Sequence, residues 1–191
     1  MARSSSHLET EIKLRLAAVP TIRRTLRQVG FRVRDRRIFE VNTIFDTAGG
    51  DLRRNNNLLR LRLAGPCHTL TFKGPPHPGR YKTRQEIESQ VTDPQALTQI
   101  LAGLGYAPVF RYEKYRTVYS NPGHAGLAML DETPVGAFLE LEGSPRSIDR
   151  MARDLGYSPA DYITASYGRL YLDHCESAGI SPRNMVFSDR K

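Results

Sequence analysis

Charged residues at alternate positions are the part of this sequence that could do chemistry. Glutamates two residues apart occur three times, and two of the pairs of basic residues with the same spacing stand out beside them. The pairs are Glu9/Glu11, Glu86/Glu88, Glu140/Glu142, Arg60/Arg62 and Lys114/Arg116. Side chains at i and i+2 of a strand share one face, so each pair sets like charges side by side, where they repel. A cation between the carboxylates and an anion between the bases would relieve that repulsion.

The two charge sets suit two kinds of ligand. Carboxylate oxygens bind hard divalent cations, whereas Arg and Lys bind phosphate oxygens, with Arg offering a planar fork of donors. A divalent metal with a triphosphate is the simplest ligand that uses both sets at once. The plainer alternative is that each charged face is the solvated side of an ordinary antiparallel sheet. The repetition of the pattern across several strands favours the binding site.

Alternating and helical patterns indicate the elements that carry these pairs. Strands are predicted at 7–16, 38–46, 57–64, 67–74, 82–91, 109–120, 126–132 and 136–143. Helices are predicted at 20–30, 93–104, 145–156 and 159–173, because Pro stands near the start of each and Gly follows the first three. Eight strands and four helices indicate an α+β fold dominated by antiparallel strands.

A closed barrel would place the charged faces together. Leu59, Leu61 and Leu63 point away from Arg60 and Arg62, so one face of each strand is apolar. If the strands curl with their charged faces inward, the interior becomes a polar tunnel and the helices cover the apolar exterior. The sequence therefore predicts an eight-stranded antiparallel barrel with helices packed on its outside.

Composition and length restrict the class of protein. The chain has 191 residues and a formal net charge of +8, which suits one domain and a polyanionic partner. Because the chain lacks an apolar run of about 20 residues and a signal-like start, we expect a cytoplasmic protein without a membrane partner. Cys67 and Cys175 form no metal or disulfide pattern, so we interpret both as reduced. We expect a single domain over residues 1–176 and a loose tail over 177–191.

Several motifs resemble those of the CYTH superfamily, also called the triphosphate tunnel metalloenzymes. Glu9-Thr10-Glu11-Ile12-Lys13 resembles its Glu-x-Glu-x-Lys signature. Segments resembling its later motifs follow in the family's order, at 42–47, 59–62, 70–74, 84–88, 113–116, 130–132 and 136–142. The resemblance covers roughly residues 7 to 172 and implies the same eight-stranded tunnel.

The resemblance implies a role for each matching charged position. Metal ligands, direct or through water, for Mg²⁺ or Mn²⁺ would be Glu9, Glu11, Glu86, Glu88, Asp131, Glu140 and Glu142. Triphosphate-binding residues would be Lys13, Arg60, Arg62, Lys73, Arg84, Lys114 and Arg116. The catalytic set would be Glu9, Glu11, Lys13, Lys73 and Arg116. Some family triphosphatases supply a lysine from a C-terminal helix, but the corresponding stretch here, 162–169, has no Lys.

Three functions remain open at this point. A triphosphatase would hydrolyse inorganic triphosphate, thiamine triphosphate or a nucleotide. A class IV-like adenylyl cyclase would use the same tunnel to convert ATP to cyclic AMP and pyrophosphate. A non-catalytic module would bind polyphosphate or RNA, although an anion clamp does not need three Glu-x-Glu pairs. We expect a triphosphatase with a small-molecule partner rather than nucleic acid, and the resemblance implies that such barrels often form homodimers.

Overall fold

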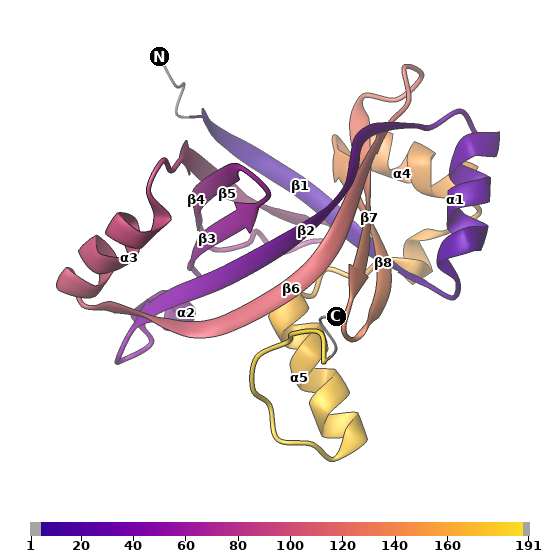
Figure 1. Ribbon diagram of the computed structural model, residues 1–191. Coiled ribbons are helices and arrows are strands. Elements are labelled where there is room, and N and C mark those ends of the chain that lie inside the picture. Colours follow the sequence, from indigo (N-terminus) through magenta and orange to yellow (C-terminus); the bar gives the residue numbers. More distant parts are fainter. Residues whose placement is uncertain (1–4, 189–191) are drawn as a thin grey trace.

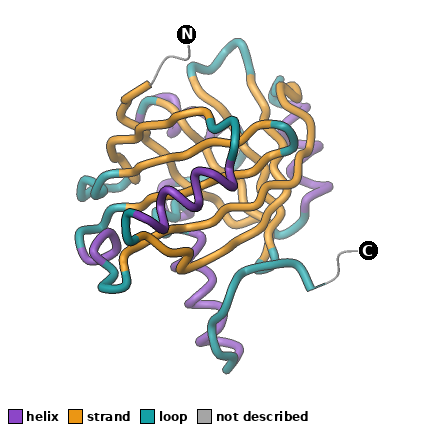
Figure 2. Tube along the Cα trace, turned by 60° about the vertical axis from the view of Figure 1, so that its left-hand side comes forward, coloured by secondary structure: helices purple, strands orange, loops and turns teal. Residues whose placement is uncertain are grey.

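The strands form one closed antiparallel barrel. The computed structural model describes residues 5–188 (Figure 1). The strands are β1 (Ser5–Leu16), β2 (Arg32–Thr47), β3 (Leu58–Ala64), β4 (Cys67–Lys73), β5 (Lys82–Gln90), β6 (Tyr106–Ser120), β7 (Gly126–Thr133) and β8 (Gly136–Gly143). Their order round the barrel is β1, β5, β4, β3, β2, β6, β7 and β8, and Figure 2 shows them curving round a common interior. The predicted barrel is confirmed.

β2 and β6 extend further than their sequence patterns predict. They pair over their whole length, from Arg32 opposite Ser120 to Thr47 opposite Tyr106. Residues 32–37 are all exposed, and the register shifts twice between Val33 and Ile38. A stretch that is exposed on both faces carries no alternation of apolar and polar residues, so the predicted start at residue 38 was too late.

Helices fill the connections between strands. They are α1 (Val19–Gln28), α2 (Asp51–Arg54), α3 (Pro94–Gly103), α4 (Pro145–Asp154) and α5 (Tyr167–Ala178), with a 3-10 turn η1 at Pro159–Asp161. Asp93 and Ser144 cap α3 and α4 by accepting backbone N–H groups. The four-residue α2 was not predicted. Within residues 5–188, no helix is both long and apolar enough to cross a membrane.

The C-terminal region differs from the prediction in two ways. The predicted helix at 159–173 is wrong at its start, because η1 ends at Asp161 and α5 begins only at Tyr167, capped by Ser166. Residues 167–173 are helical as predicted. The segment between η1 and α5 is extended, and Ile163 pairs with Lys13 of β1. The segment after α5 is also attached to the barrel, unlike a loose tail: Met185 is buried, and its backbone exchanges hydrogen bonds with Arg111 and Glu113 of β6.

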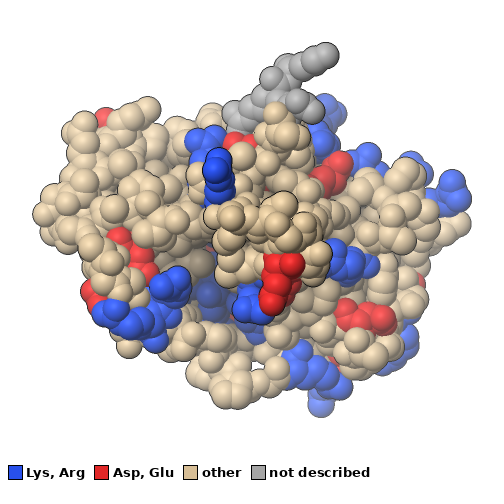
Figure 3. All heavy atoms as spheres, turned by 90° about the horizontal axis from the view of Figure 1, so that it is seen from below, with Lys and Arg blue, Asp and Glu red and all other residues tan. Residues whose placement is uncertain are grey.

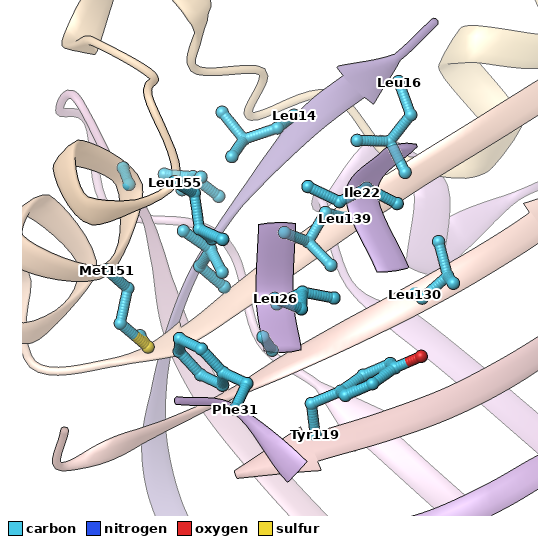
Figure 4. Packing of buried hydrophobic residues seen from close by; sticks show 14 of the residues in the cluster. Leu14, Leu16, Ile22, Leu26, Phe31, Tyr119, Leu130, Leu139, Met151 and Leu155 are labelled. Atoms are coloured by element: carbon cyan, nitrogen blue, oxygen red, sulfur yellow. The ribbon is translucent and has the colours of Figure 1, made fainter. Parts of the chain in front are cut away.

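The outer face of the barrel carries the main hydrophobic core. Leucines of β1, β7 and β8 face α1 and α4 across this core (Figure 4). Leu14, Leu26, Leu130, Leu139 and Met151 are nearly inaccessible to solvent. A smaller cluster of Phe45, Leu61 and Leu101 lies under α3. Because the apolar faces are outside, the helices stabilise the barrel by removing its exterior from water.

The helix α5 lies below the barrel in Figure 1, and several of its residues line the cavity. Its Tyr167, Leu170 and Tyr171 pack with Tyr112 of β6 and Phe138 of β8, with the docked Met185 in the same cluster. Tyr112 alternates with Lys114 and Arg116 on β6, so this cluster forms where apolar side chains follow the charged ones along the inner face. The interior therefore passes from polar to apolar toward α5.

Truncating Leu139 should destabilise the protein strongly. Leu139→Ala removes a fully buried side chain between the barrel and its helices, so we expect a loss of about 2–5 kcal/mol in the free energy of unfolding. Denaturant titration would measure the loss. Leu104→Ala is the control, because Leu104 is 68% exposed and should change stability by less than about 0.5 kcal/mol. Equal losses in both variants would contradict this assignment of the core.

Candidate active site

Charged residues from seven of the eight strands converge on one cavity inside the barrel, and β7 lines it with Leu127 and Met129. The cavity has a volume of about 1650 Å³. Seen from below, the molecule is hollowed near its centre, and Lys and Arg side chains lie in and around the hollow (Figure 3). The predicted site residues that line the cavity are Glu9, Glu11, Lys13, Arg60, Arg62, Lys73, Arg84, Glu86, Glu88, Lys114, Arg116, Glu140 and Glu142. These residues come from β1, β3, β4, β5, β6 and β8, so the alternation of charge along those strands identifies their inward faces.

The three Glu-x-Glu pairs lie on neighbouring strands. β1 pairs with β5 along its first half and with β8 along its second half. Glu11 of β1 is therefore directly opposite Glu142 of β8, while Glu9 lies opposite Arg84 in the β5 register. The pairs, which lie far apart in sequence, become one acidic wall that we define as Glu9, Glu11, Glu86, Glu88, Glu140 and Glu142.

The basic residues lie mainly on strands across from this wall. Arg60 and Arg62 come from β3, Lys114 and Arg116 come from β6, and β2 lies between those two strands. Lys73 of β4 is closer to the acids: its Nζ lies 2.5 Å from Oε2 of Glu9 and 2.9 Å from Oε2 of Glu86. Arg60, Arg62, Lys114 and Arg116 thus face the acidic wall, whereas Lys13 of β1 and Arg84 of β5 lie on the same strands as its glutamates.

Buried ion pairs hold the charged side chains in place. Lys13 Nζ lies 3.2 Å from both Glu11 Oε1 and Glu140 Oε1. Arg62 Nη2 lies 3.3 Å from Glu88 Oε1, and Arg116 also pairs with Glu140. Because these groups are largely screened from water, each one depends on its partner for solvation.

The pKa values divide the acidic wall into two parts. Burial would raise the pKa of Glu11, but Lys13 and Lys82 outweigh it and hold that pKa well below its ordinary value. Lys13 and Arg116 likewise keep the pKa of Glu140 low against burial. For Glu142, burial and then Glu9, Glu11 and Glu86 raise the pKa to about 7. Burial and then Glu11 also raise the pKa of Glu9. Burial and the neighbouring carboxylates therefore disfavour the charged forms of Glu9 and Glu142.

The structure places Asp131 behind the cavity wall. Its side chain is fully buried, and within the described chain it is not among the cavity-lining residues. Oδ1 accepts from Arg116 Nε at 2.7 Å, and Oδ2 accepts from Lys114 Nζ at 2.8 Å and from Arg116 Nη2 at 2.6 Å. With both oxygens occupied by cations of β6, Asp131 fits the orientation of those cations better than the metal ligation that the resemblance implied.

Sequence reasoning missed three polar residues of the tunnel. Glu40 and Asn42 of β2 line or face the interior and are buried, and Glu40 Oε2 and both amide atoms of Asn42 have no hydrogen-bond partner among the described residues. Burial opposes ionisation of Glu40, but Lys114 and Arg116 lower its pKa to about 2. Lys82 of β5 lies 3.1 Å from Glu11, and burial lowers its pKa to about 8. The i, i+2 spacing of Glu40 and Asn42, and of Lys82 and Arg84, was the signal available.

The chemistry of the acidic wall fits a divalent cation. Within residues 5–188, no three His, Cys, Asp or Glu side chains are arranged so that they could hold a metal ion as they stand, and the ammonium of Lys73 lies between Glu9 and Glu86. The donors are nevertheless carboxylate oxygens, which hard cations prefer. A cation among these carboxylates would offset the mutual repulsion that, after burial, raises the pKa values of Glu9 and Glu142.

Comparison with known proteins decides the family. The CYTH domain model matches residues 7–167, which is most of the chain and includes every strand of the barrel from β1 to β8. The chain belongs to the CYTH family. This CYTH protein shares with its family the closed eight-stranded barrel, so the expected fold and family are both confirmed.

Three proteins from other organisms resemble this CYTH chain in sequence or in fold. A Methanocaldococcus jannaschii protein named "Putative adenylate cyclase MJ0240" is 30% identical over 143 residues, covering 74% of this chain and 80% of that protein. The PH1819 protein of Pyrococcus horikoshii superposes with a TM-score of 0.73 at 25% identity, covering 87% and 99%. HpAC1 of Hippeastrum superposes with a TM-score of 0.63 at 20% identity, covering 91% and 97%.

Glu142 should make folding stability depend on pH. The pKa of Glu142 is higher in the folded protein than in the unfolded chain. The free energy of unfolding therefore falls as pH rises from the ordinary pKa of 4.5 to about 7. In EDTA, Glu142→Gln should therefore match the wild type near pH 5 and exceed its unfolding free energy by about 1–2 kcal/mol at pH 8. Denaturant titrations at the two pH values would measure this.

Glu88→Gln is the matched control for that experiment. Arg62 lowers the pKa of Glu88 against the effect of burial, so the sign is reversed and neutralising Glu88 should reduce stability at pH 8. Two variants that shift in the same direction would show that the acidic wall is not divided as described.

Proposed function

We propose that this CYTH protein is a divalent-metal-dependent triphosphatase. The observation that carries the proposal is the tunnel itself, in which a wall of carboxylates faces a set of Arg and Lys side chains around one cavity. Family members are triphosphatases or adenylyl cyclases, and their tunnels are in general dependent on divalent metals. A ligand that is itself part cation and part polyanion matches both sides, as a metal triphosphate does.

The cavity-lining residues would divide the work between metal and phosphate. The metal would be held by Glu9, Glu11, Glu86, Glu88, Glu140 and Glu142, which offer only oxygen donors. When bound, it would supply charge neutralisation for the phosphate oxygens and lower the pKa of a coordinated water. The triphosphate would be bound by Lys13, Arg60, Arg62, Lys73, Arg84, Lys114 and Arg116, to which the structure adds Lys82. We propose Glu9, Glu11, Lys13, Lys73 and Arg116 as the catalytic set.

The chain's own cations would stabilise the charge that develops during hydrolysis. Water attacks the terminal phosphorus, the bond to the bridging oxygen breaks, and phosphate and a shortened polyphosphate leave. Arg and Lys donors fixed by ion pairs stabilise the departing oxygens without reorganising, which is the main advantage of a preorganised polar site. Because no Ser, Cys or Asp nucleophile motif is visible, we propose direct attack by water without a covalent intermediate.

The comparisons support hydrolysis and leave adenylyl cyclase activity as the alternative. HpAC1 is named as an adenylyl cyclase, yet triphosphatase activity is described as dominant in that protein. The M. jannaschii relative also carries a cyclase name. The alternative is therefore conversion of ATP to cyclic AMP and pyrophosphate in the same tunnel. A small-molecule triphosphate partner, a cytoplasmic location, a homodimer and a domain boundary at residue 176 stay predictions.

Direct assay of the purified protein would separate the two reactions. With Mg²⁺ or Mn²⁺, we expect phosphate to be released from tripolyphosphate, thiamine triphosphate or ATP without cyclic AMP. Glu9→Gln and Glu142→Gln should each reduce turnover to below about one-hundredth, because each removes an oxygen donor and charge from the metal side. Glu132→Gln is the control, since Glu132 contacts Arg23 and Arg37 outside the tunnel. Cyclic AMP with matching pyrophosphate, or near-normal turnover in both tunnel variants, would overturn the proposal.

Arg60 should contribute mainly to binding the phosphate chain. Its guanidinium is buried in the tunnel, 3.2 Å from the Thr71 hydroxyl. Arg60→Ala should lower kcat/KM for tripolyphosphate by about 10- to 100-fold, the size expected from losing hydrogen bonds between charged groups. Arg37→Ala provides the comparison, because the Arg37 guanidinium stacks on Tyr115 outside the barrel. Steady-state kinetics that gave the two variants equal kcat/KM would remove Arg60 from the binding set.

A further inference from the structure

The C-terminal segment is attached to the tunnel at one point of β1. The backbone N–H of Lys13 donates to the carbonyl of Ile163 at 2.8 Å, and the N–H of Ile163 donates back to Lys13 at 2.9 Å. Three residues later Ser166 caps α5, and Tyr167 is the first residue of that helix. The extended pairing and the helix start together direct the Tyr167 side chain into the barrel, where it is buried and lines the cavity.

The ring of Tyr167 contacts two lysines of the proposed phosphate-binding set. Lys13 Nζ lies 5.2 Å from the ring centroid and Lys114 Nζ lies 5.0 Å from it. Both distances are within the range of cation–π attraction, which is stronger where water is excluded. Phe138 meets the ring edge-on and Tyr112 is tilted against it, so the ring is itself held by its neighbours.

The hydroxyl of Tyr167 joins a third charged residue to this arrangement. It donates to Asp131 Oδ2 at 2.7 Å, the same oxygen that accepts from Lys114 and Arg116. Burial and then Asp131 and Glu140 hold the pKa of Tyr167 well above its ordinary value, so the hydroxyl stays a donor. One side chain of α5 thus contacts charged residues of β1, β6 and β7.

We propose that Tyr167 is a positioning residue that orients Lys13 and Lys114 toward the bound phosphate chain, an inference that rests on the proposed function. A lysine has four rotatable side-chain bonds, and these two are also attracted to Glu140, Glu11 and Glu40. The aromatic face restricts where each ammonium can lie, so less conformational entropy is lost when the ligand binds.

This role agrees with the absence of a lysine from the stretch that leads into α5. Residues 162–169 contain no lysine. Arg169, the basic residue of the stretch, pairs with Asp173 at 2.6 Å, and its side chain is 63% exposed. The segment therefore contributes to the tunnel by ordering cations that come from the barrel strands, instead of adding a buried cation of its own.

Three variants separate the ring, the hydroxyl and the packing of α5. Tyr167→Leu removes ring and hydroxyl, and Tyr167→Phe removes the hydroxyl alone. Leu170→Ala weakens the packing of the same helix at a described residue that does not line the cavity. We would measure the Tm of each, the Kd for tripolyphosphate by calorimetry in EDTA, and kcat and KM with metal present.

Tyr167→Leu should weaken tripolyphosphate binding and lower kcat/KM by roughly tenfold or more, because both cation–π contacts are lost. Tyr167→Phe should recover most of the affinity, to within about threefold, because Asp131 Oδ2 still accepts from two cations. Leu170→Ala should lower Tm while leaving Kd, kcat and KM near the wild-type values.

The inference is overturned if Tyr167→Leu binds tripolyphosphate as the wild type does, or if Leu170→Ala loses as much affinity at a similar Tm. Binding in EDTA keeps the two hypotheses apart. A wild type that binds but does not turn over any triphosphate, with affinity still lost in Tyr167→Leu, would sustain the role of Tyr167 and refute the triphosphatase. Normal turnover with an unaffected Tyr167→Leu variant would do the reverse. A wild type that binds no tripolyphosphate would refute both.

Discussion

The constraint on which the rest of the structure depends is that charges inside a barrel must neutralise one another. More than a dozen ionisable side chains line or adjoin the cavity, and unpaired charge there would be costly. β1 meets this constraint because it lies between β5 and β8 and presents Glu9, Glu11 and Lys13 to both. Where pairing is incomplete, as at Glu142, the pKa rises. A ligand that carries charge of both signs can complete what the side chains leave unbalanced.

A charged interior requires an apolar exterior, and this inversion explains the helices. The leucines that alternate with the tunnel residues point outward, and α1 and α4 remove them from water. Packing therefore stabilises the outside of the barrel, while the inside is organised by ion pairs. The interior differs at the end next to α5, where aromatic residues take the place of charged ones on the inner face. At this end the ring of Tyr167 contacts Lys13 and Lys114.

The features that could be predicted from sequence are those with a strict period. Alternation predicted all eight strands and the charged faces of β1, β3, β5, β6 and β8, because a strand changes face at every residue. The start of the helix predicted at 159–173 could not be found from sequence. Ser158 and Pro159 are typical of a helix start, but only a 3-10 turn forms there. Asp131 shares the inward face, yet its burial behind Lys114 and Arg116 depends on contacts between strands. Glu40 and Asn42 were missed because a single acid beside an amide lacks the repeated charge.

The pairing of Lys13 with Ile163 has a consequence for how the protein folds during synthesis. This contact, like that between Glu11 and Glu142, joins residues more than a hundred positions apart. Contacts of such sequence separation form slowly, because a long loop must close before they gain any energy. β1 must therefore wait for β8 and for the segment around Ile163 before its side of the tunnel is complete. The ion pairs between β1 and β8, such as that of Lys13 with Glu140, can form only after both strands have been synthesised.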